Sequence, residues 1–280
     1  MVKNKRVVIT GGGRGLGLAF ARSFLEQGAK VTITGRDATT LAKAAQTLGG
    51  QVQTQAFDIS NAMATKAAFD DIHQRQGAID VLVNNAGSWG PVDYFWNTSL
   101  EEWQEAMDIN VKGPVYCTHA VLRHRVDHQV DSTTTIINIT SHAGAYRWPT
   151  ASSYSISRAA IIKLTENLAF ETRHKGVALF AYHPGLVVGT GLVADGLAIS
   201  EEEGTPRRAI QQWVLAEQEA GRTVSAEQGA RNLLRLASGG YSALSGCYLT
   251  VQDDLDALLA DQHAIRADGL LTLRVKSRSA

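Results

Sequence analysis

The chain has 280 residues, of which 44% are hydrophobic and 19% charged, enough to bury the core of one large α/β domain. Its 27 basic and 27 acidic residues balance, so nucleic acid and anionic membranes are not expected partners, and a small uncharged molecule is favoured. Cys117 and Cys247 stand in no CxxC or metal-ligand spacing, so we expect buried thiols and no metal site. The apolar run at 7–9 leaves no room for a signal peptide, and no apolar stretch is long enough to span a membrane, so a cytoplasmic protein is expected.

Short β-branched runs alternate along the chain with longer helical patterns. The runs expected to be strands are Arg6–Thr10, Lys30–Thr34, Val52–Phe57, Val81–Asn84, Thr135–Ser141, Ala178–His183 and Cys247–Val251. Strands that alternate with helices form right-handed βαβ units around a parallel sheet. The predicted fold is therefore α/β: a single-domain Rossmann fold with a doubly wound, seven-stranded parallel sheet and helices on both faces.

A glycine-rich turn, Thr10-Gly11-Gly12-Gly13-Arg14-Gly15-Leu16-Gly17, closes the first strand and opens the first helix. Backbone N–H groups and the helix dipole favour phosphate at such a place. The spacing differs from G-x-G-x-x-G, but the physical roles should be the same: Gly11 permits the turn, Gly15 admits the pyrophosphate, and Gly17 lets the helix pack on the sheet. The turn predicts a dinucleotide cofactor.

The second strand ends at Gly35-Arg36, where an acidic residue would hold the adenosine ribose 2′-hydroxyl in an NAD(H) enzyme. Without that carboxylate, Arg36 and Arg14 can both reach a 2′-phosphate and form bidentate contacts with it. NADP(H) is therefore the predicted cofactor. The alternative is that Arg36 is a solvated residue at a helix start, with Asp37 beside it weakening the positive field.

Tyr154 and Arg158 stand four residues apart and share one face of a predicted helix. A cation favours the ionised form of a neighbouring phenol, so the pair predicts a tyrosine that works as an acid or base. Arginine is planar, bulkier and more diffuse in charge than lysine, so the two are not interchangeable here.

Together these features resemble the short-chain dehydrogenase/reductase family over about Lys5–Val251. The resemblance also rests on Asp58-Ile59 after the third strand, Asn84-Asn85-Ala86-Gly87 after the fourth, Asn110 in a helix, Ser141 at the end of the fifth strand and Pro184-Gly185 after the sixth. Taken alone, Ser141 could be a strand-end cap and Tyr154 a core aromatic. Their order and spacing together favour the functional interpretation.

The resemblance implies hydride transfer between nicotinamide and a carbonyl or alcohol carbon, with Tyr154 as acid/base. Ser141 would hydrogen-bond the substrate carbonyl, Asn110 would distort its helix and hold a water in a proton relay, and Arg158 would stand in for the family's lysine. The residues expected to bind the cofactor are Gly11, Arg14, Gly15, Leu16, Gly17, Arg36, Asp58, Ile59, Asn85, Ala86, Gly87, Tyr154, Arg158, Pro184, Gly185, Val187 and Thr190.

The sequence departs from the family pattern in two places. Arg158 replaces lysine, so Arg158→Lys would raise turnover if arginine is merely tolerated and lower it if the site has adapted to the guanidinium. After the sixth strand, one extra residue displaces Thr190 by one position from the spacing of the family's cofactor contact.

Aromatic residues gather in two loops on the rim of the expected site. The residues assigned to a substrate pocket are Trp89, Tyr94, Trp96, His142, Tyr146 and Trp148. Loop aromatics at a site commonly form an apolar wall, which suits a hydrophobic ketone, although simple packing would explain them equally well. His142 could orient a substrate or be merely solvated.

The C-terminal half adds two further expectations about organisation. Residues 1–251 should form the NADP-binding domain, including a loop-rich substrate lid at about 189–222 with a helix over Pro206–Ala220, and Ser225 should begin a helix with a capping box. Residues 252–280 should be an extension, helical over Asp253–Ala267 and packed through Leu270–Val275 on the domain or at a subunit interface. The resemblance implies a homodimer or homotetramer.

The function expected from the sequence is that of an NADP(H)-dependent ketoreductase or alcohol dehydrogenase that acts on a hydrophobic carbonyl. A polycyclic or polyketide-like ketone of secondary metabolism is one such substrate. Two alternatives stay open. One is a non-redox enzyme of the same fold, a dehydratase, isomerase or cyclase; the other is a catalytically silent nucleotide-binding scaffold.

Overall fold

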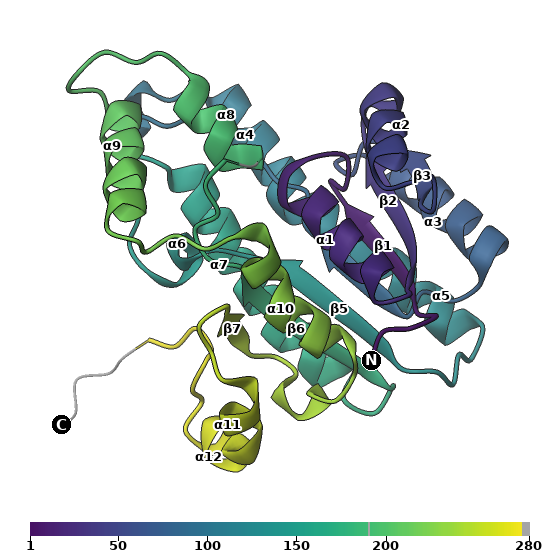
Figure 1. Cartoon of the computed structure of the whole chain (residues 1–280). Coiled ribbons are helices and arrows are strands. Elements are labelled where there is room, and N and C mark those ends of the chain that lie inside the picture. Colours follow the sequence, from purple (N-terminus) through teal and green to yellow (C-terminus); the bar gives the residue numbers. More distant parts are fainter. Residues whose placement is uncertain (190, 276–280) are drawn as a thin grey trace.

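The computed structural model of the protein describes residues 1–189 and 191–275. Seven parallel strands form one sheet in the order β3-β2-β1-β4-β5-β6-β7 (Figure 1). The strands are β1 (Arg6–Thr10), β2 (Lys30–Gly35), β3 (Gln53–Ala56), β4 (Val81–Asn84), β5 (Thr134–Ile139), β6 (Val177–His183) and β7 (Tyr248–Thr250). The predicted fold is confirmed, and the strand order reverses between β1 and β4, the place where α/β sheets open a ligand crevice.

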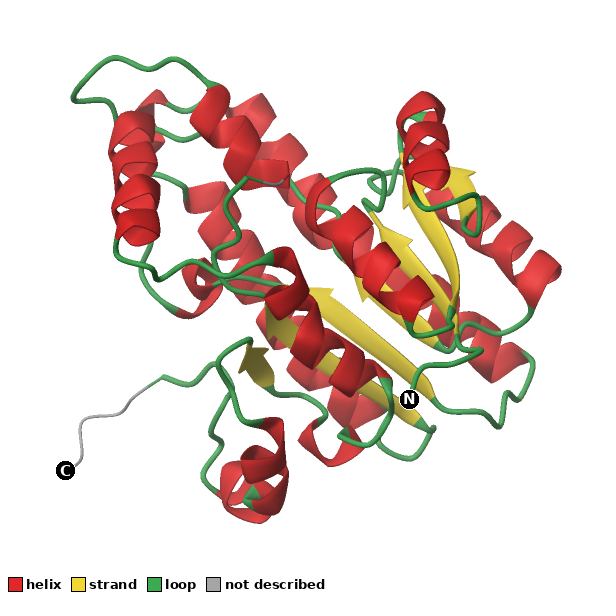
Figure 2. Ribbon diagram, in the orientation of Figure 1, coloured by secondary structure: helices red, strands yellow, loops and turns green. Residues whose placement is uncertain are grey.

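Helices cover both faces of the sheet (Figure 2). One face carries α1 (Gly15–Glu26), α2 (Ala38–Thr47) and α10 (Ala226–Ala237), and the other carries α3 (Ala62–Gln76), α5 (Gly113–Asp127) and α7 (Ser152–Glu171). Strand side chains alternate between the two faces, because Val7 and Ile9 belong to one buried cluster and Val8 to the other.

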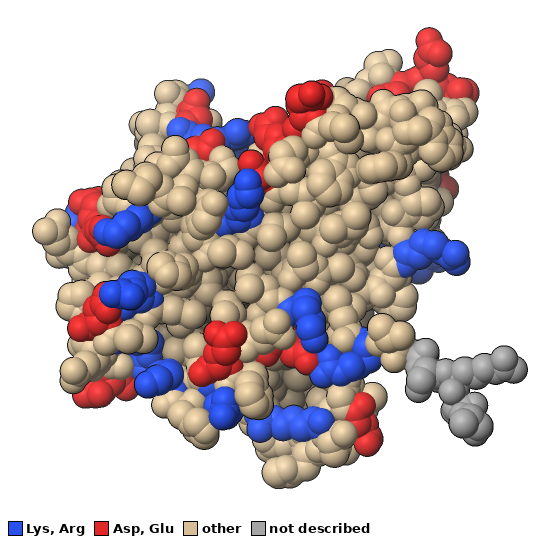
Figure 3. Space-filling view, turned by 180° about the vertical axis from the view of Figure 1, so that it is seen from behind, with Lys and Arg blue, Asp and Glu red and all other residues tan. Residues whose placement is uncertain are grey.

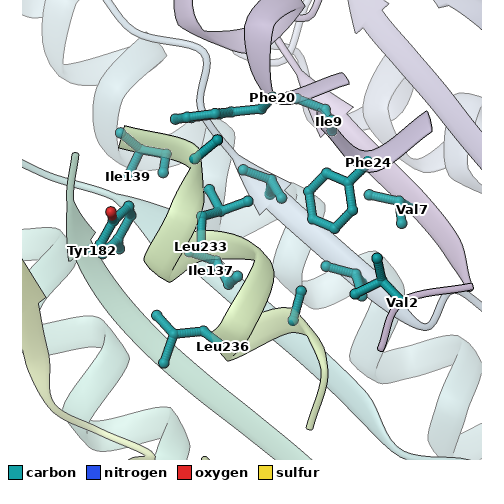
Figure 4. Close-up of a cluster of buried hydrophobic side chains, with 14 of the residues drawn as sticks. Val2, Val7, Ile9, Phe20, Phe24, Ile137, Ile139, Tyr182, Leu233 and Leu236 are labelled. Carbon is teal, nitrogen blue, oxygen red and sulfur yellow. The ribbon is translucent and has the colours of Figure 1, made fainter. Parts of the chain in front are cut away.

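The larger cluster joins α1 and α10 across the middle of the sheet (Figure 4). Phe20 and Phe24 of α1 and Leu233 and Leu236 of α10 are fully buried there. Helix α10 begins with the predicted capping box, in which the Ser225 hydroxyl and the Gln228 side chain each accept a backbone N–H bond. This packing sets the position of α1 and therefore of the glycine-rich turn that precedes it.

Between β4 and β5 the chain forms the 3₁₀ turn Phe95–Asn97, α4 (Leu100–Met107) and a π-helix over Asp108–Lys112 that runs directly into α5. The short helix α6 (His142–Ala145) follows β5. The predicted fifth strand runs on to Ser141, but the observed strand ends at Ile139 and Ser141 caps α6.

After β6, the chain folds into α8 (Gly191–Ala198) and α9 (Pro206–Glu219). Helix α9 matches the expected Pro206–Ala220 helix, and Thr205 caps it through a bond from the Arg208 N–H. Helix α8 lies in a stretch that the sequence predicts to be loop, because its glycines obscure the apolar positions between them.

The segment after β7 contains two short helices, α11 (Leu255–Ala260) and α12 (Gln262–Ala267), in place of one helix, and a 3₁₀ turn, Ser242–Leu244, lies just before the strand. Leu255 and Ile265 are buried in the large cluster. The Tyr248 N–H donates to Leu271 O at 2.7 Å, so the segment covers the free edge of β7. The side chains of Leu270 and Val275 are exposed in the single chain, so these two residues do not pack on the domain, and their packing at a subunit interface stays a prediction.

The surface carries charges of both signs close together, as the face seen in Figure 3 illustrates. Within the described residues, no helix combines the length and apolar character needed to cross a membrane.

Candidate active site

The glycine-rich turn lies against the loop that follows β4. A Cβ on Gly11, where φ is +64°, would lie 2.9 Å from Ala86 Cα, and a Cβ on Gly17 would lie 2.2 Å from Gly11 O. Asn85 joins the two loops, because its Nδ2 donates to Thr10 O at 2.9 Å and Gly11 O at 3.2 Å. The structure therefore brings Gly11, Gly17, Asn85 and Ala86 together at the switch point of the sheet.

Helix α1 begins without a capping side chain. Arg14 at its N-cap makes no side-chain cap bond, and its first turn contains no acidic residue. In contrast, α2, α3, α4, α9, α10 and α11 each begin with a side chain that accepts a backbone N–H bond. The uncapped N–H groups of α1, at Gly15 to Gly17, have the arrangement that binds a phosphate group, so the residues present fit a dinucleotide.

The end of β2 supplies the expected cationic residue. Arg36 is exposed between Gly35 and Asp37, and the Asp37 carboxylate caps α2 by accepting the Thr40 N–H at 2.6 Å. This backbone bond lowers the pKa of Asp37. Arg14 pairs with Asp195 of α8, with 2.6 Å between Nη1 and Oδ2.

Asp58 and Ile59 follow β3 at the same edge of the sheet. The Asp58 carboxylate accepts bonds from the Ser60 N–H and hydroxyl at 2.9 and 2.7 Å, which fixes its orientation. The Ile59 side chain is only 6% exposed and packs under Gly113 at the start of α5. Its contact with an adenine is therefore limited to the small exposed part.

Tyr154 and Arg158 lie side by side on α7. The Arg158 Cζ atom lies 4.8 Å from the centre of the Tyr154 ring, and Nη1 donates to Ile139 O at 3.2 Å. Arg158 is 4% exposed, and its buried Nε has no hydrogen-bond partner among the described residues. A Cβ on Gly87 would lie 2.4 Å from Nη2, so the glycine leaves the room that the guanidinium fills.

Asn110 lies in the π-helix and clamps the loop after β4. Its Oδ1 accepts the Ser88 N–H at 2.8 Å, and its Nδ2 donates to Ser88 O at 2.8 Å and Ser157 Oγ at 3.1 Å. The Ser157 hydroxyl donates to Tyr154 O at 2.7 Å. Asn110 is fully buried, so it links the loop after β4 to the turn of α7 that bears Tyr154.

Ser141 begins α6, and its hydroxyl accepts the Ala143 N–H at 3.2 Å. Helix α6 packs against α7, where the Ser155 hydroxyl donates to Ala143 O at 2.7 Å. A Cβ on Gly144 would lie 2.6 Å from the Arg158 carbonyl carbon, so the two helices are in backbone contact. Ser141 thus has both a capping role and a place beside the α7 turn that carries the tyrosine.

Trp89 is the predicted pocket aromatic that contacts Tyr154. Its ring stacks on Tyr154 with 4.6 Å between centres, and its indole N–H donates to Leu192 O of α8 at 3.0 Å. Trp89 also lines a small apolar cavity beneath α8 and α9. The other lining residues are Val92, Val193, Gly196, Leu197, Arg207, Ile210, Gln211 and Val214.

The other predicted pocket residues are spread more widely. Trp148 packs edge-on against Trp213 of α9 at 4.9 Å. Tyr94 and Trp96 stack on each other with exposed fractions of 50% and 79%, and neither lines the cavity.

His142 and Tyr146 form a separate group that does not line this cavity. Their rings stack at 5.4 Å, and His142 also contacts His183 edge-on at 4.5 Å. Burial lowers the pKa of both histidines, that of His183 to about 3, so both rings are neutral near pH 7.

Pro184, Gly185 and Val187 follow β6. Gly185 has φ +88°, and a Cβ there would lie 2.5 Å from Val224 Cγ2, so only glycine fits this turn. Val187 is 4% exposed, which leaves chiefly its backbone for a cofactor contact. Thr190, also predicted to bind the cofactor, lies outside the described residues.

Several residues of the site are not predicted by the sequence, namely Ser88, Ser157, Asp195 and the apolar residues of α8 and α9. Ser157 could have been found from its place one turn after Tyr154, but nothing local marks Asp195. Within residues 1–189 and 191–275, no group of three or more His, Cys, Asp or Glu side chains is arranged to hold a metal ion.

The family model described as short chain dehydrogenase matches residues 5–197. The chain belongs to this family. Its members are oxidoreductases that use a nicotinamide cofactor, which agrees with the uncapped glycine turn. A 2-(S)-hydroxypropyl-CoM dehydrogenase of Xanthobacter autotrophicus is 31% identical over 263 residues, covering 92% of this chain and 98% of the relative.

Two further similarities concern the cofactor and the fold. An NADP-dependent 3-hydroxy acid dehydrogenase of Salmonella typhi is 34% identical over 184 residues, covering 66% of this chain and 73% of that protein. The crystal structure of a variant of actinorhodin polyketide ketoreductase with NADPH matches with a TM-score of 0.79 and 25% identity, covering 89% of this chain and 95% of the other.

Proposed function

We propose that this short-chain dehydrogenase is an NADP(H)-dependent ketoreductase or alcohol dehydrogenase that acts on a hydrophobic carbonyl or the matching alcohol. The observation that carries the proposal is the Tyr154–Arg158 pair at the carboxyl edge of the sheet, with Trp89 stacked on the phenol and an apolar cavity beside it. Apolar walls with a few polar groups are typical of pockets for hydrophobic ligands.

The preference for NADP(H) rests on charge at the end of β2. Gly35 offers no carboxylate to repel a 2′-phosphate, Asp37 is engaged as a helix cap, and Arg36 is exposed. Among relatives, the hydroxy acid dehydrogenase is named NADP-dependent and the ketoreductase was solved with NADPH, which supports the same choice. Guanidinium groups suit phosphate because they donate in a planar fork.

Tyr154 on α7 and Ser141 at the start of α6 would have separate roles at the substrate oxygen. When bound, the nicotinamide supplies or accepts the hydride. Tyr154 would protonate the carbonyl oxygen during reduction, and Ser141 would donate a hydrogen bond to the same oxygen. Arg158 would favour the phenolate electrostatically, and its unpartnered Nε and its Nη2 would serve the cofactor ribose. Asn110 would position this turn through Ser157.

The substrate would enter between the loop after β4 and the α8–α9 segment, which we propose as the lid of the domain formed by 1–251. Its apolar residues and Trp89 favour a hydrophobic ketone, and the similarity to a polyketide ketoreductase makes fused-ring ketones and secondary metabolism the first choice. Residues 252–280 would serve as an extension at the β7 edge.

A homodimer or homotetramer is part of the proposal. The exposed apolar side chains Val126, Ile156 and Phe170 on or near α5 and α7 support an assembly through these helices. Light scattering on the eluted protein tests it, and a monomer at micromolar concentration would contradict it.

The function is tested by supplying NADPH with fused-ring, aromatic and short polar ketones and following NADPH oxidation and product mass. We expect turnover of the hydrophobic ketones, with products heavier by two hydrogens. Tyr154→Phe should lose at least ~10³-fold in kcat while it keeps its NADP⁺ affinity, because it lacks the proton to transfer.

Other outcomes favour the alternatives. A product of unchanged mass would favour an isomerase or cyclase reaction, and a product lighter by one water would favour a dehydratase. Tight NADP⁺ binding without turnover of any carbonyl or alcohol would favour a nucleotide-binding scaffold.

Arg158→Lys tests whether the site has adapted to arginine. We expect kcat to fall about tenfold, because one ammonium cannot donate to Ile139 O and also occupy the space beside Gly87. A rise in kcat would mean that arginine is only tolerated, and unchanged kinetics would remove Arg158 from the mechanism.

A further inference from the structure

Helix α8 lies directly against the glycine-rich turn. A Cβ on Gly191 would lie 3.5 Å from Gly15 Cα and 3.9 Å from the Leu16 backbone nitrogen. The first residue of α8 therefore covers part of the uncapped start of α1, the place where the proposed cofactor's phosphates would bind.

An ion pair joins the same two elements. Arg14 Nη1 lies 2.6 Å from Asp195 Oδ2, and the two side chains are 64% and 48% exposed. Exposed pairs of this kind contribute little to stability. The main consequence of the Arg14–Asp195 contact is therefore its effect on the other groups that Arg14 can bind. Arg36, the other cation proposed for the 2′-phosphate, forms no ion pair with any residue in the described ranges.

We propose that Asp195 is a specificity-determining residue that weakens NADP(H) binding by competing with the 2′-phosphate for Arg14. This inference rests on the proposed function, in which Arg14 contacts that phosphate. A carboxylate held on Arg14 must be displaced before the guanidinium can bind the 2′-phosphate, and while it is in place it neutralises half of the cationic site. NAD(H) lacks the 2′-phosphate, so Asp195 affects it much less.

The test is a thermodynamic cycle on the full chain at low salt. Dissociation constants for NADP⁺ and NAD⁺ are measured by calorimetry for the wild type, Asp195→Asn, Arg14→Gln and the double variant. Asp195→Asn should bind NADP⁺ about five- to tenfold more tightly, since an ion pair across a few ångströms of water, which NADP⁺ no longer has to break, is worth roughly that factor, and NAD⁺ less than about twofold more tightly. In the Arg14→Gln background the same substitution should change NADP⁺ affinity little, because no guanidinium is then left for the carboxylate to occupy.

Glu219→Gln, an exposed site at the end of α9, is the matched control, because it changes the net charge equally without contacting Arg14. The inference is overturned if Asp195→Asn leaves NADP⁺ affinity unchanged, strengthens both cofactors equally, or acts as strongly without Arg14. Failure of the proposed function looks different: the wild type itself would not bind NADP⁺, which would overturn the inference as well.

Discussion

The two faces of the sheet bury different kinds of side chain at the carboxyl ends of their strands. On the α1–α10 face, Ile9, Ile139 and Tyr182 join a cluster that is almost entirely hydrocarbon, and the buried Tyr182 phenol is satisfied by Gly229 O at 2.8 Å. On the α5–α7 face, Asn84 and Asn138 are buried instead.

These amides form a continuous network. Asn84 Nδ2 donates to Asn138 Oδ1 at 2.7 Å and to Thr118 of α5 at 3.0 Å, and Asn138 Nδ2 donates to Thr165 of α7 at 2.9 Å. Apolar packing tolerates exchanges of similar volume, whereas a hydrogen-bonded network fixes one orientation. Both faces bury apolar clusters, so the difference lies at the carboxyl ends of the strands, where the α5–α7 face adds a polar network that holds α7, with Tyr154 and Arg158, in one register.

The largest expected effect is the loss of apolar volume from the first face. Leu233→Ala removes a fully buried side chain from the cluster and should lower the free energy of unfolding by about 4 kcal/mol, which urea titration measures. The kcat of the folded fraction of this variant should stay within about twofold of the wild-type value. Leu215→Ala, at a residue 45% exposed on α9, is the control and should change stability by less than ~0.5 kcal/mol. A large fall in kcat for Leu233→Ala would mean that the α1–α10 cluster also positions the site, which contradicts the difference drawn between the two faces.

Lowering the pH should reduce the free energy of unfolding through His73, which is buried between α3 and α5. His73 stacks on His124 between α3 and α5 at 3.6 Å, and burial lowers its pKa to about 4, with further effects from the Gly77 carbonyl, His124, Asp70 and His128. The native ring stays neutral while the unfolded one binds a proton below pH 6.5. Stability is therefore complete above pH 6.5 and should fall by up to about 3 kcal/mol as the pH drops towards 4.

Unfolding free energies at about pH 7, 5.5 and 4.5 measure this loss. His73→Gln should flatten part of the profile, because its side chain takes up no proton, whereas the control His263→Gln, on exposed α12, should leave the slope as it is. An identical slope in His73→Gln would mean that other buried groups, such as His183, carry the acid sensitivity.

Two buried asparagines offer a direct comparison between the faces. Asn110→Ala removes the clamp on Ser88 and Ser157, and Asn232→Ala on α10 removes bonds to Thr250 O and Asp253 O. Each should cost about 2 kcal/mol of stability, because carbonyl or hydroxyl groups lose buried partners. Asn110→Ala alone should also lower kcat, roughly tenfold, without a matching rise in KM. Equal effects on kcat would argue against a positioning role for Asn110.

The fold could be predicted from the sequence because strands and turns are encoded locally. β-branched runs, the glycine turn and the Ser225 capping box each act within a few residues, so their patterns survive without knowledge of packing. The structure brings the predicted Tyr154 and Arg158 together, because residues four apart share one face of a helix, whereas the role of Ser141 comes from the family resemblance and stays a prediction.

The parts that escaped prediction depend on contacts between distant segments. Trp89 and Trp96 lie in the same aromatic loop, yet one stacks on Tyr154 and the other faces solvent. Helix α8 has Gly191 and Gly196 among its few residues, so its propensity is low and its docking on α1 and Trp89 decides its conformation. Composition alone predicts neither the contact of Trp89 with Tyr154 nor the helical conformation of α8.

The smallest expected effect concerns the start of α10, whose capping box contrasts with the uncapped start of α1. Ser225→Ala removes the hydroxyl that accepts the Gln228 N–H at 3.1 Å and should lower stability by about 1 kcal/mol. NADP⁺ affinity should not change, because this cap satisfies the backbone of a helix that serves the apolar face. Ser225→Thr keeps an accepting hydroxyl and should recover most of the stability. If Ser225→Ala instead weakened NADP⁺ binding at full stability, the start of α10 would belong to the site, through the Val224 N–H bond to Leu186 O at 3.0 Å.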